Sequence, residues 1–352
     1  MSDEISSFVE EAVKAGTIPG AALIASHNGK TVYEKTWGTC CTRTERATPV
    51  TKNTRHLFFS YSKLITATVF ALVWEREGFA LDRPVREFLP SFTGGGKDAI
   101  TVRHTLTHSA GIPNADLTEV ESAAGWDAFL AQLSKKEVEW KPGSKTAYHA
   151  LTGHFLAAAI ASKLAGKPWE RLCQELLFQP LGAKTLTFTT PDPREFLAMT
   201  PQPKELPAKS LGGFAGHPAG GCSGTMQDAL KVLQLHMDDG IWRKKRLLKP
   251  ETLAELHRVQ YPGQSATHEP WGLGFLLRGT GPAGGGHGWF GFQNQSEPRI
   301  FGHAGIDTVI GVADPVHRRA LFFATTDSPK PQERVAPLRN GITDRVFRLE
   351  SA

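Results

Sequence analysis

The sequence predicts an α+β fold, in which an antiparallel sheet flanked by helices from both chain ends stands beside a mainly helical region. Two observations support this prediction. Segments rich in β-branched and aromatic residues lie towards both ends, at 21–38 and from 271 onward. Between them, from about 58 to 250, apolar residues recur at helical spacing and loops separate the segments. Strands at both ends imply that the two ends of the chain share one sheet.

The length of the chain predicts two parts. At 352 residues it is too long for one small core. We expect a discontinuous sheet-containing part that comprises 1–57 and 250–352. The mainly helical part then comprises 58–249.

The amino-terminal end predicts a helix and then a hairpin. Apolar residues lie at helical spacing in the segment MSDEISSFVEEAVKAG: Ile5, Phe8, Val9, Ala12 and Val13. The next segment, 21–38, has two β-rich runs around Asn28-Gly29. An Asn-Gly pair between extended runs favours a tight turn, because a type I′ turn needs positive φ at both central residues.

The middle of the chain predicts helices that end at glycine. One begins near Ser60 and stops at Gly78, and two more span 153–166 and 226–240. Glycine favours a helix end because it adopts the left-handed conformation at little cost. The segment 101–108 predicts a further, short helix.

The last part of the chain predicts strands and a terminal helix. The strand segments are WGLGFLLRG, RIFGHAGIDTVIGVADP and RRALFFATTD, with a turn at Asp314-Pro315. Val335, Leu338, Ile342 and Val346 then lie at helical spacing. We therefore expect the chain to finish in a packed helix.

Composition and charge exclude several classes of function. Apolar residues at 40% and charged residues at 21% are ordinary globular values. The net charge of +5 comes from dispersed basic residues, and the densest run, 243–246, is expected to be a solvated loop. The start lacks a secretory signal, and no apolar stretch approaches a membrane span. We expect a soluble, cytoplasmic protein without nucleic-acid or membrane partners.

The cysteines and glycine-rich segments indicate no cofactor. The four cysteines include an adjacent pair, Cys40-Cys41, and no CxxC exists, so we expect buried reduced thiols. The segments 94–98 and 279–288 are rich in glycine but lack the spacing of a phosphate-binding loop. No motif requires a metal or an organic cofactor.

Ser60-Tyr61-Ser62-Lys63 is the one Ser-x-x-Lys in the chain. On a helix, residues three apart share a face, so the Ser60 hydroxyl and the Lys63 amine can form a hydrogen bond. A serine needs an adjacent base, and a lysine desolvated by apolar neighbours can act as one. The alternative is a helix start at which Ser60 is a cap and Lys63 extends to solvent. Ser62 falls on another face and is expected to be structural.

Other segments offer weaker candidates. Thr107 to Gly111 is close to a Gly-x-Ser-x-Gly elbow around Ser109, but a helical segment precedes it where a strand is needed. His104 and His108 are four residues apart without the glutamate of a zinc helix, so a structural histidine that bonds a loop carbonyl is expected. Phe290 and Phe292 are candidates for an aromatic acyl pocket.

Several ordered segments resemble the serine β-lactamase and penicillin-binding-protein family, in its class C-like branch with related carboxylesterases, D-peptidases and acyltransferases. They are FFSYSKLITATVFALVWEREGFALDRPVREFLP, TVRHTLTHSAGIP, PAGGCSGTMQDALKVL, WGLGF and FGHAGIDTVIGVADP. The resemblance implies a β-lactamase/transpeptidase-like fold. It also implies that Ser60 is the acylated nucleophile, Lys63 its proton partner and Tyr148 a second base.

The chain departs from the family pattern at two elements. Ala150 stands where the family's Tyr-x-Asn motif has asparagine, so an amide that contacts the lysine or the substrate is lost. His303-Ala304-Gly305 stands where β-lactamases have Lys-Thr-Gly, and a histidine that is only partly charged at neutral pH holds a carboxylate less firmly than lysine. The resemblance further implies an oxyanion hole formed by the backbone N–H groups of Ser60 and Ile306.

The sequence therefore predicts a serine hydrolase that acts on a small-molecule ester or amide through an acyl-Ser60 intermediate. Ala150 and His303 favour carboxylic esters. A β-lactamase, a D-amino-acid peptidase or an acyltransferase of the same family is the first alternative. A non-catalytic relative that binds ligands in the same cleft is the second.

Overall fold

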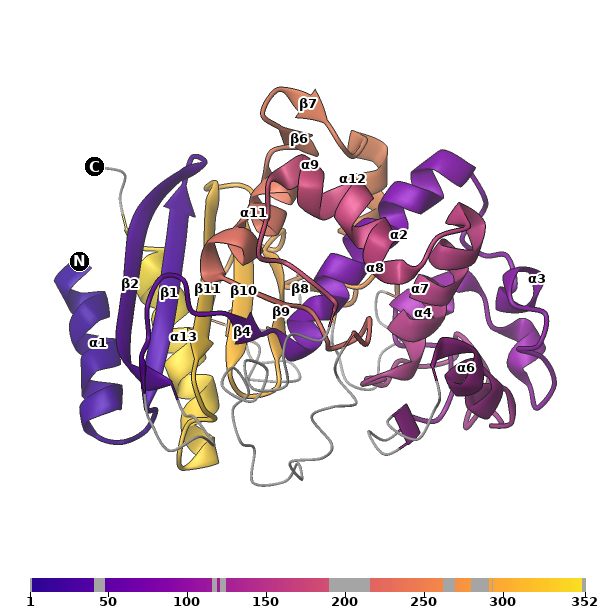
Figure 1. Ribbon diagram of the computed structural model, residues 1–352, viewed down its shortest axis with the longest axis horizontal. Helices are drawn as coiled ribbons and strands as arrows, with labels where there is room; N and C mark the ends of the chain where they lie inside the picture. Colours follow the sequence, from indigo (N-terminus) through magenta and orange to yellow (C-terminus); the bar gives the residue numbers. More distant parts are fainter. Residues whose placement is uncertain are drawn as a thin grey trace.

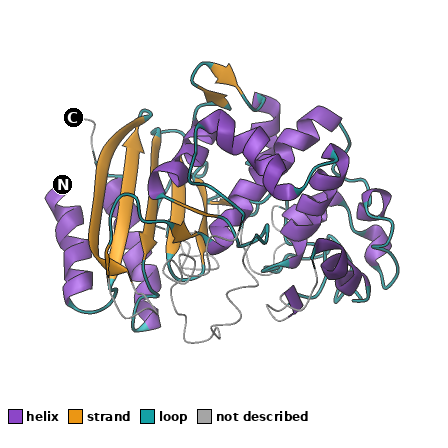
Figure 2. Cartoon of the chain, in the orientation of Figure 1, coloured by secondary structure: helices purple, strands orange, loops and turns teal. Residues whose placement is uncertain are grey.

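A seven-stranded antiparallel sheet forms one end of the molecule, and the helical region forms the other (Figures 1 and 2). The computed structural model describes residues 2–40, 48–115, 119–120, 125–189, 216–261, 270–279, 291–292 and 294–349. Within these ranges the strand order is β3-β2-β1-β11-β10-β9-β8. The strands are β1 (Gly20–His27), β2 (Lys30–Cys40), β3 (Thr48–Pro49), β8 (Leu276–Leu277), β9 (Phe301–Gly305), β10 (Val309–Asp314) and β11 (Arg319–Thr325).

The two chain ends meet in the middle of this sheet. β1 pairs with β11 from Ala21 opposite Thr325 to His27 opposite Arg319. The turn between β1 and β2 has φ of +50° at Asn28 and +74° at Gly29. The predicted α+β fold with one shared antiparallel sheet is confirmed, and so is the predicted hairpin.

The terminal helices α1 (Ser2–Lys14) and α13 (Val335–Val346) cover one face of the sheet. Alternation along the strands explains how the sheet buries both faces. Leu321 and Phe323 of β11 pack with the terminal helices, whereas Phe322 between them packs with the helical region. α11 (Met226–Met237) lies on that second face, against β11, β10 and β1.

The helical region is built around α2 (Ser62–Glu77), whose residues Ser62 to Val73 are all buried. Because α2 is buried on all sides, its sequence mixes apolar and small residues and has no amphipathic stripe. α2 ends at Gly78 with φ of +65°, as predicted. Around it lie α3 (Val85–Phe88), α4 (Val102–Leu106), α6 (Trp126–Ser134), α7 (Thr152–Ala165), α8 (Trp169–Cys173), a π-helical turn (Gln174–Phe178), α9 (Gln179–Leu181) and α12 (Pro250–Leu256).

Short elements connect the two regions. The strands β4 (His56–Leu57) and β5 (Ser223–Gly224) pair beside the start of α2, and β6 (Ile241–Trp242) pairs with β7 (Lys245–Arg246). Short 3-10 turns lie at Phe59–Tyr61, Lys97–Ala99 and Gln332–Arg334. The residue ranges of the two expected parts stay a prediction, although α11, from the expected helical part, packs on the sheet.

One predicted strand is shorter than expected. Of WGLGFLLRG, only Leu276 and Leu277 form a strand, β8. Gly274 has φ of +78°, and the Leu273 N–H donates to the carbonyl of Leu256 instead of to a neighbouring strand. The glycine-rich loop after Gly279 lies outside the described residues. No helix in the described part of the chain has the length and apolar character needed to cross a bilayer.

Candidate active site

Ser60 and Lys63 lie together where the short turn Phe59–Tyr61 runs into α2. Lys63 Nζ donates hydrogen bonds to Ser60 Oγ at 2.9 Å and to the carbonyl of Ala219 at 2.9 Å. The Lys63 side chain is fully buried, and burial lowers the pKa of its amine well below the ordinary lysine value. The alternative of a solvent-reaching lysine is therefore wrong. Ser60 likewise caps no helix.

The backbone around Ser60 is held by a distant segment at Cys222. Phe59 has a φ of +45°, which is rare for a residue with a side chain and needs support from its surroundings. The Phe58 N–H donates to the carbonyl of Cys222 at 2.9 Å, and Ser62 Oγ accepts from the Cys222 N–H at 3.0 Å. Ser62 is therefore structural, as predicted.

Gly305 of β9 lies directly against this backbone. A Cβ atom at Gly305 would stand 2.0 Å from the Phe58 carbonyl oxygen. Only glycine permits this approach, which brings the end of β9 beside the serine. This contact explains why the last residue of His303-Ala304-Gly305 is glycine.

Tyr148 faces the same pair. Lys63 Nζ lies 5.1 Å from the centroid of the Tyr148 ring. Burial raises the pKa of the Tyr148 phenol, and the nearby Ser60 hydroxyl opposes this rise. The two hydroxyls are thus close, although the Tyr148 hydroxyl makes no hydrogen bond of good geometry to the described residues. Sequence reasoning placed Tyr148 beside Ser60 and Lys63, and the structure brings the three together.

Asn114 holds the segment that contains Tyr148 and Ala150. Its Oδ1 accepts a hydrogen bond from the Ala150 N–H at 2.6 Å, and its Nδ2 donates to the Tyr148 carbonyl at 3.3 Å. Sequence reasoning missed this residue, because nothing in its own neighbourhood indicates a partner 36 residues away. Ala150 itself packs against the cluster of Leu57, Phe59, Leu151 and Ala219.

His303 is fully buried in β9, and its Nδ1 donates to the carbonyl of Ala304 at 2.7 Å. Nδ1 therefore holds the proton, which makes Nε2 an acceptor in the neutral ring. Burial lowers the pKa of His303 to about 3. The expectation of a partly charged histidine at neutral pH is wrong, because no solvent reaches the ring.

Further histidines surround the site. The His108 ring lies 4.6 Å from that of Tyr148, 5.5 Å from that of His154 and 4.4 Å from that of Trp271. Burial lowers the pKa of His108 and of His154 well below the ordinary value. The histidines around Lys63 are therefore buried and uncharged, which is an environment that favours the neutral form of its amine. Sequence reasoning did not predict this cluster.

His149, the residue after Tyr148, contacts Trp140 and His108. The His149 ring stacks on Trp140 at 5.6 Å between centroids. The backbone N–H of His149 donates to Nδ1 of His108 at 3.0 Å. His104 is structural: its Nδ1 accepts from the Thr101 N–H at 3.1 Å and closes the start of α4. Its ring also makes a hydrogen bond to the backbone of Ala99 that raises its pKa against the lowering by burial, as a carbonyl acceptor does, so the expected bond to a loop carbonyl is confirmed. Within the described ranges, no group of three or more His, Cys, Asp and Glu side chains is arranged to hold a metal ion.

The two N–H groups of the predicted oxyanion hole lie on adjoining segments. Ser60 belongs to the turn before α2, and Ile306 follows Gly305, which contacts that turn. Neither N–H has a backbone acceptor among the described residues. An N–H at a helix start lacks an intrahelical partner and is available to a ligand.

The rival nucleophile is excluded by its setting. Ser109 is fully buried, and its hydroxyl hydrogen-bonds that of Thr107 at 2.8 Å. It follows α4 and not a strand, so it forms no nucleophile elbow. Phe292 packs in the core between the sheet and the terminal helices, and Phe290 lies outside the described residues. Cys40, Cys173 and Cys222 are buried free thiols, as expected, and Cys41 lies outside the described residues.

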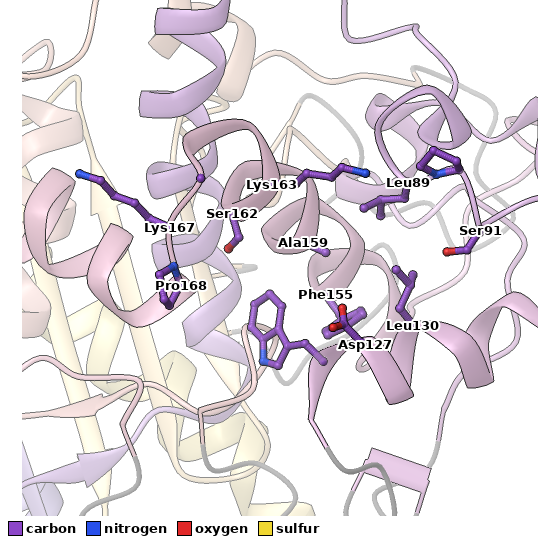
Figure 3. Close-up of a pocket in the computed structure, with 13 residues that line it drawn as sticks. Leu89, Ser91, Asp127, Leu130, Phe155, Ala159, Ser162, Lys163, Lys167 and Pro168 are labelled. Carbon is purple, nitrogen blue, oxygen red and sulfur yellow. The ribbon is translucent and has the colours of Figure 1, made fainter.

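A cavity of about 550 Å³ lies elsewhere, on the helical region (Figure 3). Trp126 and Leu130 of α6 and Phe155, Ala159 and Lys163 of α7 contribute to its wall. None of the predicted site residues lines it. The chemistry around Ser60 is therefore separate from this cavity.

Comparison with known proteins adds a family context to this geometry. A family model described as beta-lactamase matches residues 5–342. Esterase EstB of Burkholderia gladioli is 24% identical over an alignment 325 residues long, which covers 78% of this chain and 79% of the relative. N-acetylmuramyl-L-alanine amidase of Bacillus subtilis (strain 168) is 24% identical over an alignment 373 residues long, which covers 93% of this chain and 81% of the relative.

A solved structure has the same fold. The crystal structure of a penicillin-binding protein homologue from Caulobacter crescentus has a TM-score of 0.79 at 20% identity. The match covers 98% of this chain and 97% of that one. The predicted fold class is confirmed over nearly the whole chain.

Proposed function

The chain belongs to the beta-lactamase family, and from that premise we propose that it is a serine hydrolase that cleaves carboxylic esters through an acyl-Ser60 intermediate. The observation that supports this most directly is the 2.9 Å hydrogen bond between Ser60 Oγ and the Nζ atom of Lys63, whose side chain is fully buried. A desolvated amine that touches a hydroxyl is the arrangement that activates a serine nucleophile. A protein that only bound ligands would gain nothing from a buried lysine whose desolvation costs free energy.

In acylation, the Ser60 proton would pass to the leaving alkoxide, and the acyl group would pass from the ester oxygen to Ser60 Oγ. Neutral Lys63 accepts the Ser60 proton while Ser60 Oγ attacks the ester carbonyl. The tetrahedral oxyanion is stabilised by the N–H groups of Ser60 and Ile306. As the intermediate collapses, the alkoxide leaves with a proton that Tyr148 relays from Lys63, and the acyl group stays on Ser60.

Deacylation would repeat these steps with water as the nucleophile. Lys63 and Tyr148 take a proton from water as it attacks the acyl-Ser60 carbonyl. Ser60 then leaves as an alkoxide and recovers its proton from Lys63, which releases the carboxylic acid. Each catalytic residue returns to its starting protonation state, so the cycle needs no further co-reactant.

Two features of the pocket favour esters over β-lactams and peptides. Ala150 offers a methyl group where an amide would otherwise contact the acyl-amide carbonyl. His303 is neutral, because burial lowers its pKa to about 3, so it offers no cation for a substrate carboxylate. An uncharged ester needs neither an amide nor a cation in the pocket. The similarity to Esterase EstB supports the same choice.

Covalent labelling tests this proposal. A fluorophosphonate probe should modify Ser60, with mass spectrometry of the digest to locate the adduct among Ser60, Ser62 and Ser109. Ser60→Ala should lose the label, whereas Ser62→Ala and Ser109→Ala should keep it if they fold. Wild-type protein should then hydrolyse p-nitrophenyl acetate and butyrate and turn over nitrocefin poorly.

The same experiment separates the alternatives. Equal slow ester hydrolysis by wild type and Ser60→Ala, without labelling, would support a binding protein and contradict the proposal. Rapid acylation by nitrocefin followed by a stall would indicate a penicillin-binding protein instead of an esterase.

A further inference from the structure

Arg339 of α13 is a cation buried beneath the turn that joins β9 to β10. Its side chain is among the largest fully buried ones in the described part of the chain. Its Nη2 donates to the carbonyls of Gly305 at 3.1 Å and Val309 at 3.2 Å, and also to that of Ile306. A buried guanidinium is costly unless its donors are satisfied. Here the acceptors are carbonyls of the turn that contains the predicted oxyanion-hole residue.

The bond to Gly305 reaches the oxyanion hole through a single amide. The Gly305 carbonyl and the Ile306 N–H are the two ends of one planar peptide unit. A cation that donates to the oxygen of an amide favours the resonance form with positive charge on nitrogen. The N–H at the other end then becomes a stronger donor, as in other chains of polarised hydrogen bonds.

The bonds to Ile306 and Val309 also determine where that N–H points. Ile306 has a φ of +26°, which a residue with a branched side chain adopts only when its neighbours hold it there. Arg339 donates to the carbonyl before this strained residue, that of Gly305, and to the carbonyl of Ile306 itself. The Thr308 N–H also donates to the Gly305 carbonyl, at 3.0 Å. These hydrogen bonds hold the turn in one conformation and so fix the direction in which the Ile306 N–H points.

The guanidinium keeps its charge under ordinary conditions. Burial lowers the pKa of Arg339 to about 9, and the carboxylate of Asp307 opposes this fall. At pH 7 the side chain is therefore a cation that faces the β9–β10 turn.

We infer that Arg339 is a positioning residue of the oxyanion hole, which polarises and orients the Gly305–Ile306 amide so that the Ile306 N–H binds the developing oxyanion more strongly. This inference rests on the proposed function, because it requires an ester carbonyl attached to Ser60. It predicts that the charge and reach of Arg339 affect the chemical step more than substrate binding.

Arg339→Lys tests the inference, with Arg345→Lys as the matched control. Arg345 lies on the same helix but packs on the Phe8 ring at 3.9 Å, on the side of the terminal helices. Lysine keeps a charge at position 339 but lacks the planar, pre-organised donors of the guanidinium. We expect Arg339→Lys to lower kcat for p-nitrophenyl butyrate about 10- to 100-fold with KM changed less than about threefold. Arg345→Lys should leave both constants unchanged.

The carbonyl stretch of the acyl-enzyme gives a readout that loss of stability would not move. ¹³C-carbonyl p-nitrophenyl pivalate acylates serine hydrolases and deacylates slowly, so the ester carbonyl can be followed by isotope-edited infrared spectroscopy. In wild type the stretch should lie below that of the free ester in water, and in Arg339→Lys it should move back towards it. Wild type alone tests the inference if the variant does not fold, since a stretch equal to that in water would overturn it.

The outcomes separate the two levels of the argument. If mass spectrometry finds no pivaloyl adduct on wild-type Ser60, the proposed function fails and the inference with it. If Ser60 is acylated in both proteins and the stretch is the same, the serine chemistry stands and the role of Arg339 is overturned.

Discussion

At the scale of single residues, the site depends on burial more than on charge. Lys63 and His303 are fully buried and Tyr148 is partly buried, and in each case burial shifts the pKa in the direction that favours the neutral form. A neutral amine, phenol and imidazole can exchange protons without large changes in solvation. The same burial costs stability, which gives a first prediction.

Replacing Lys63 with methionine should abolish activity and stabilise the fold at neutral pH. Because the pKa of buried Lys63 lies below the unfolded value of about 10.4, the unfolded state binds the extra proton, and stability rises with pH up to that value. Lys63→Met removes this penalty. We expect kcat to fall at least about 100-fold, while the Tm rises, with a gain that shrinks between pH 7 and pH 10.

Esterase assays and thermal unfolding at both pH values measure these effects. Lys163→Met is the control, since Lys163 is exposed on α7 and should leave kcat unchanged. A Lys63→Met protein that is inactive and also less stable at pH 7 would show that the two hydrogen bonds of Lys63 outweigh its desolvation.

At the scale of elements, the site is a junction of a strand end and a helix start. Gly305 lets β9 touch the Phe58 backbone, and Gly311 lets β10 touch the Tyr61 ring, where a Cβ would stand 2.1 Å from Cε2. The sheet and α2 therefore approach each other through two glycines. Side chains at these positions would push the oxyanion-hole turn away from the serine.

Gly305→Ala should damage the site beyond its effect on stability. The added Cβ meets the Phe58 carbonyl oxygen, which is backbone and cannot rotate away. We expect a loss of about 3 kcal/mol in the free energy of unfolding, measured in urea, and at least a 100-fold loss of kcat in the folded protein.

Gly20→Ala gives the comparison, because its Cβ would stand 2.5 Å from the Thr39 carbonyl oxygen, between β1 and β2. It should destabilise the protein by a similar amount and keep kcat. If folded Gly305→Ala retained full activity, the close contact at β9 would not serve the reaction.

At the scale of the whole molecule, local sequence patterns predicted the helices and strands. They did not predict side-chain contacts between residues that are far apart in the chain. Periodicity and turn chemistry predicted the hairpin and the end of α2 at Gly78, because each depends on neighbours in the chain. The shared sheet was inferred from the presence of strand patterns at both chain ends, and the register of β1 against β11 was not predicted. The Ser60–Lys63 contact was predictable for the same reason, since the two residues share a helix face. Asn114, Arg339 and the histidines around Lys63 were not, because their partners lie 30 or more residues away. The charge state of His303 was also missed, since burial is a property of the completed fold.

The buried histidines make the whole fold sensitive to acid. His56 and His149 have pKa values lowered to about 4, and His217, His257 and His303 to about 3, in each case mainly by burial. A histidine binds a proton near pH 6.5 in the unfolded state, so stability is fully present above that pH and is lost as the pH falls towards the folded values. At pH 5 each costs about 2 kcal/mol, or on the order of 10 kcal/mol together, which is comparable with the whole stability of a domain.

We therefore expect cooperative unfolding at about pH 5, with uptake of several protons, when circular dichroism is followed from pH 8 downward.

His257→Phe should move the midpoint of acid unfolding to lower pH, because it removes one buried imidazole. The His257 ring stacks on Phe301 at 4.2 Å, in a setting that suits a phenyl ring and lies outside the catalytic residues. His317→Gln is the exposed control and should leave the midpoint where it is. A wild-type protein that stays folded at pH 4, or a His257→Phe protein with an unchanged midpoint, would contradict the link between buried imidazoles and acid stability. Activity of His257→Phe at pH 7.5 should equal that of wild type, because the substitution changes the proton uptake of unfolding and not the chemistry at Ser60.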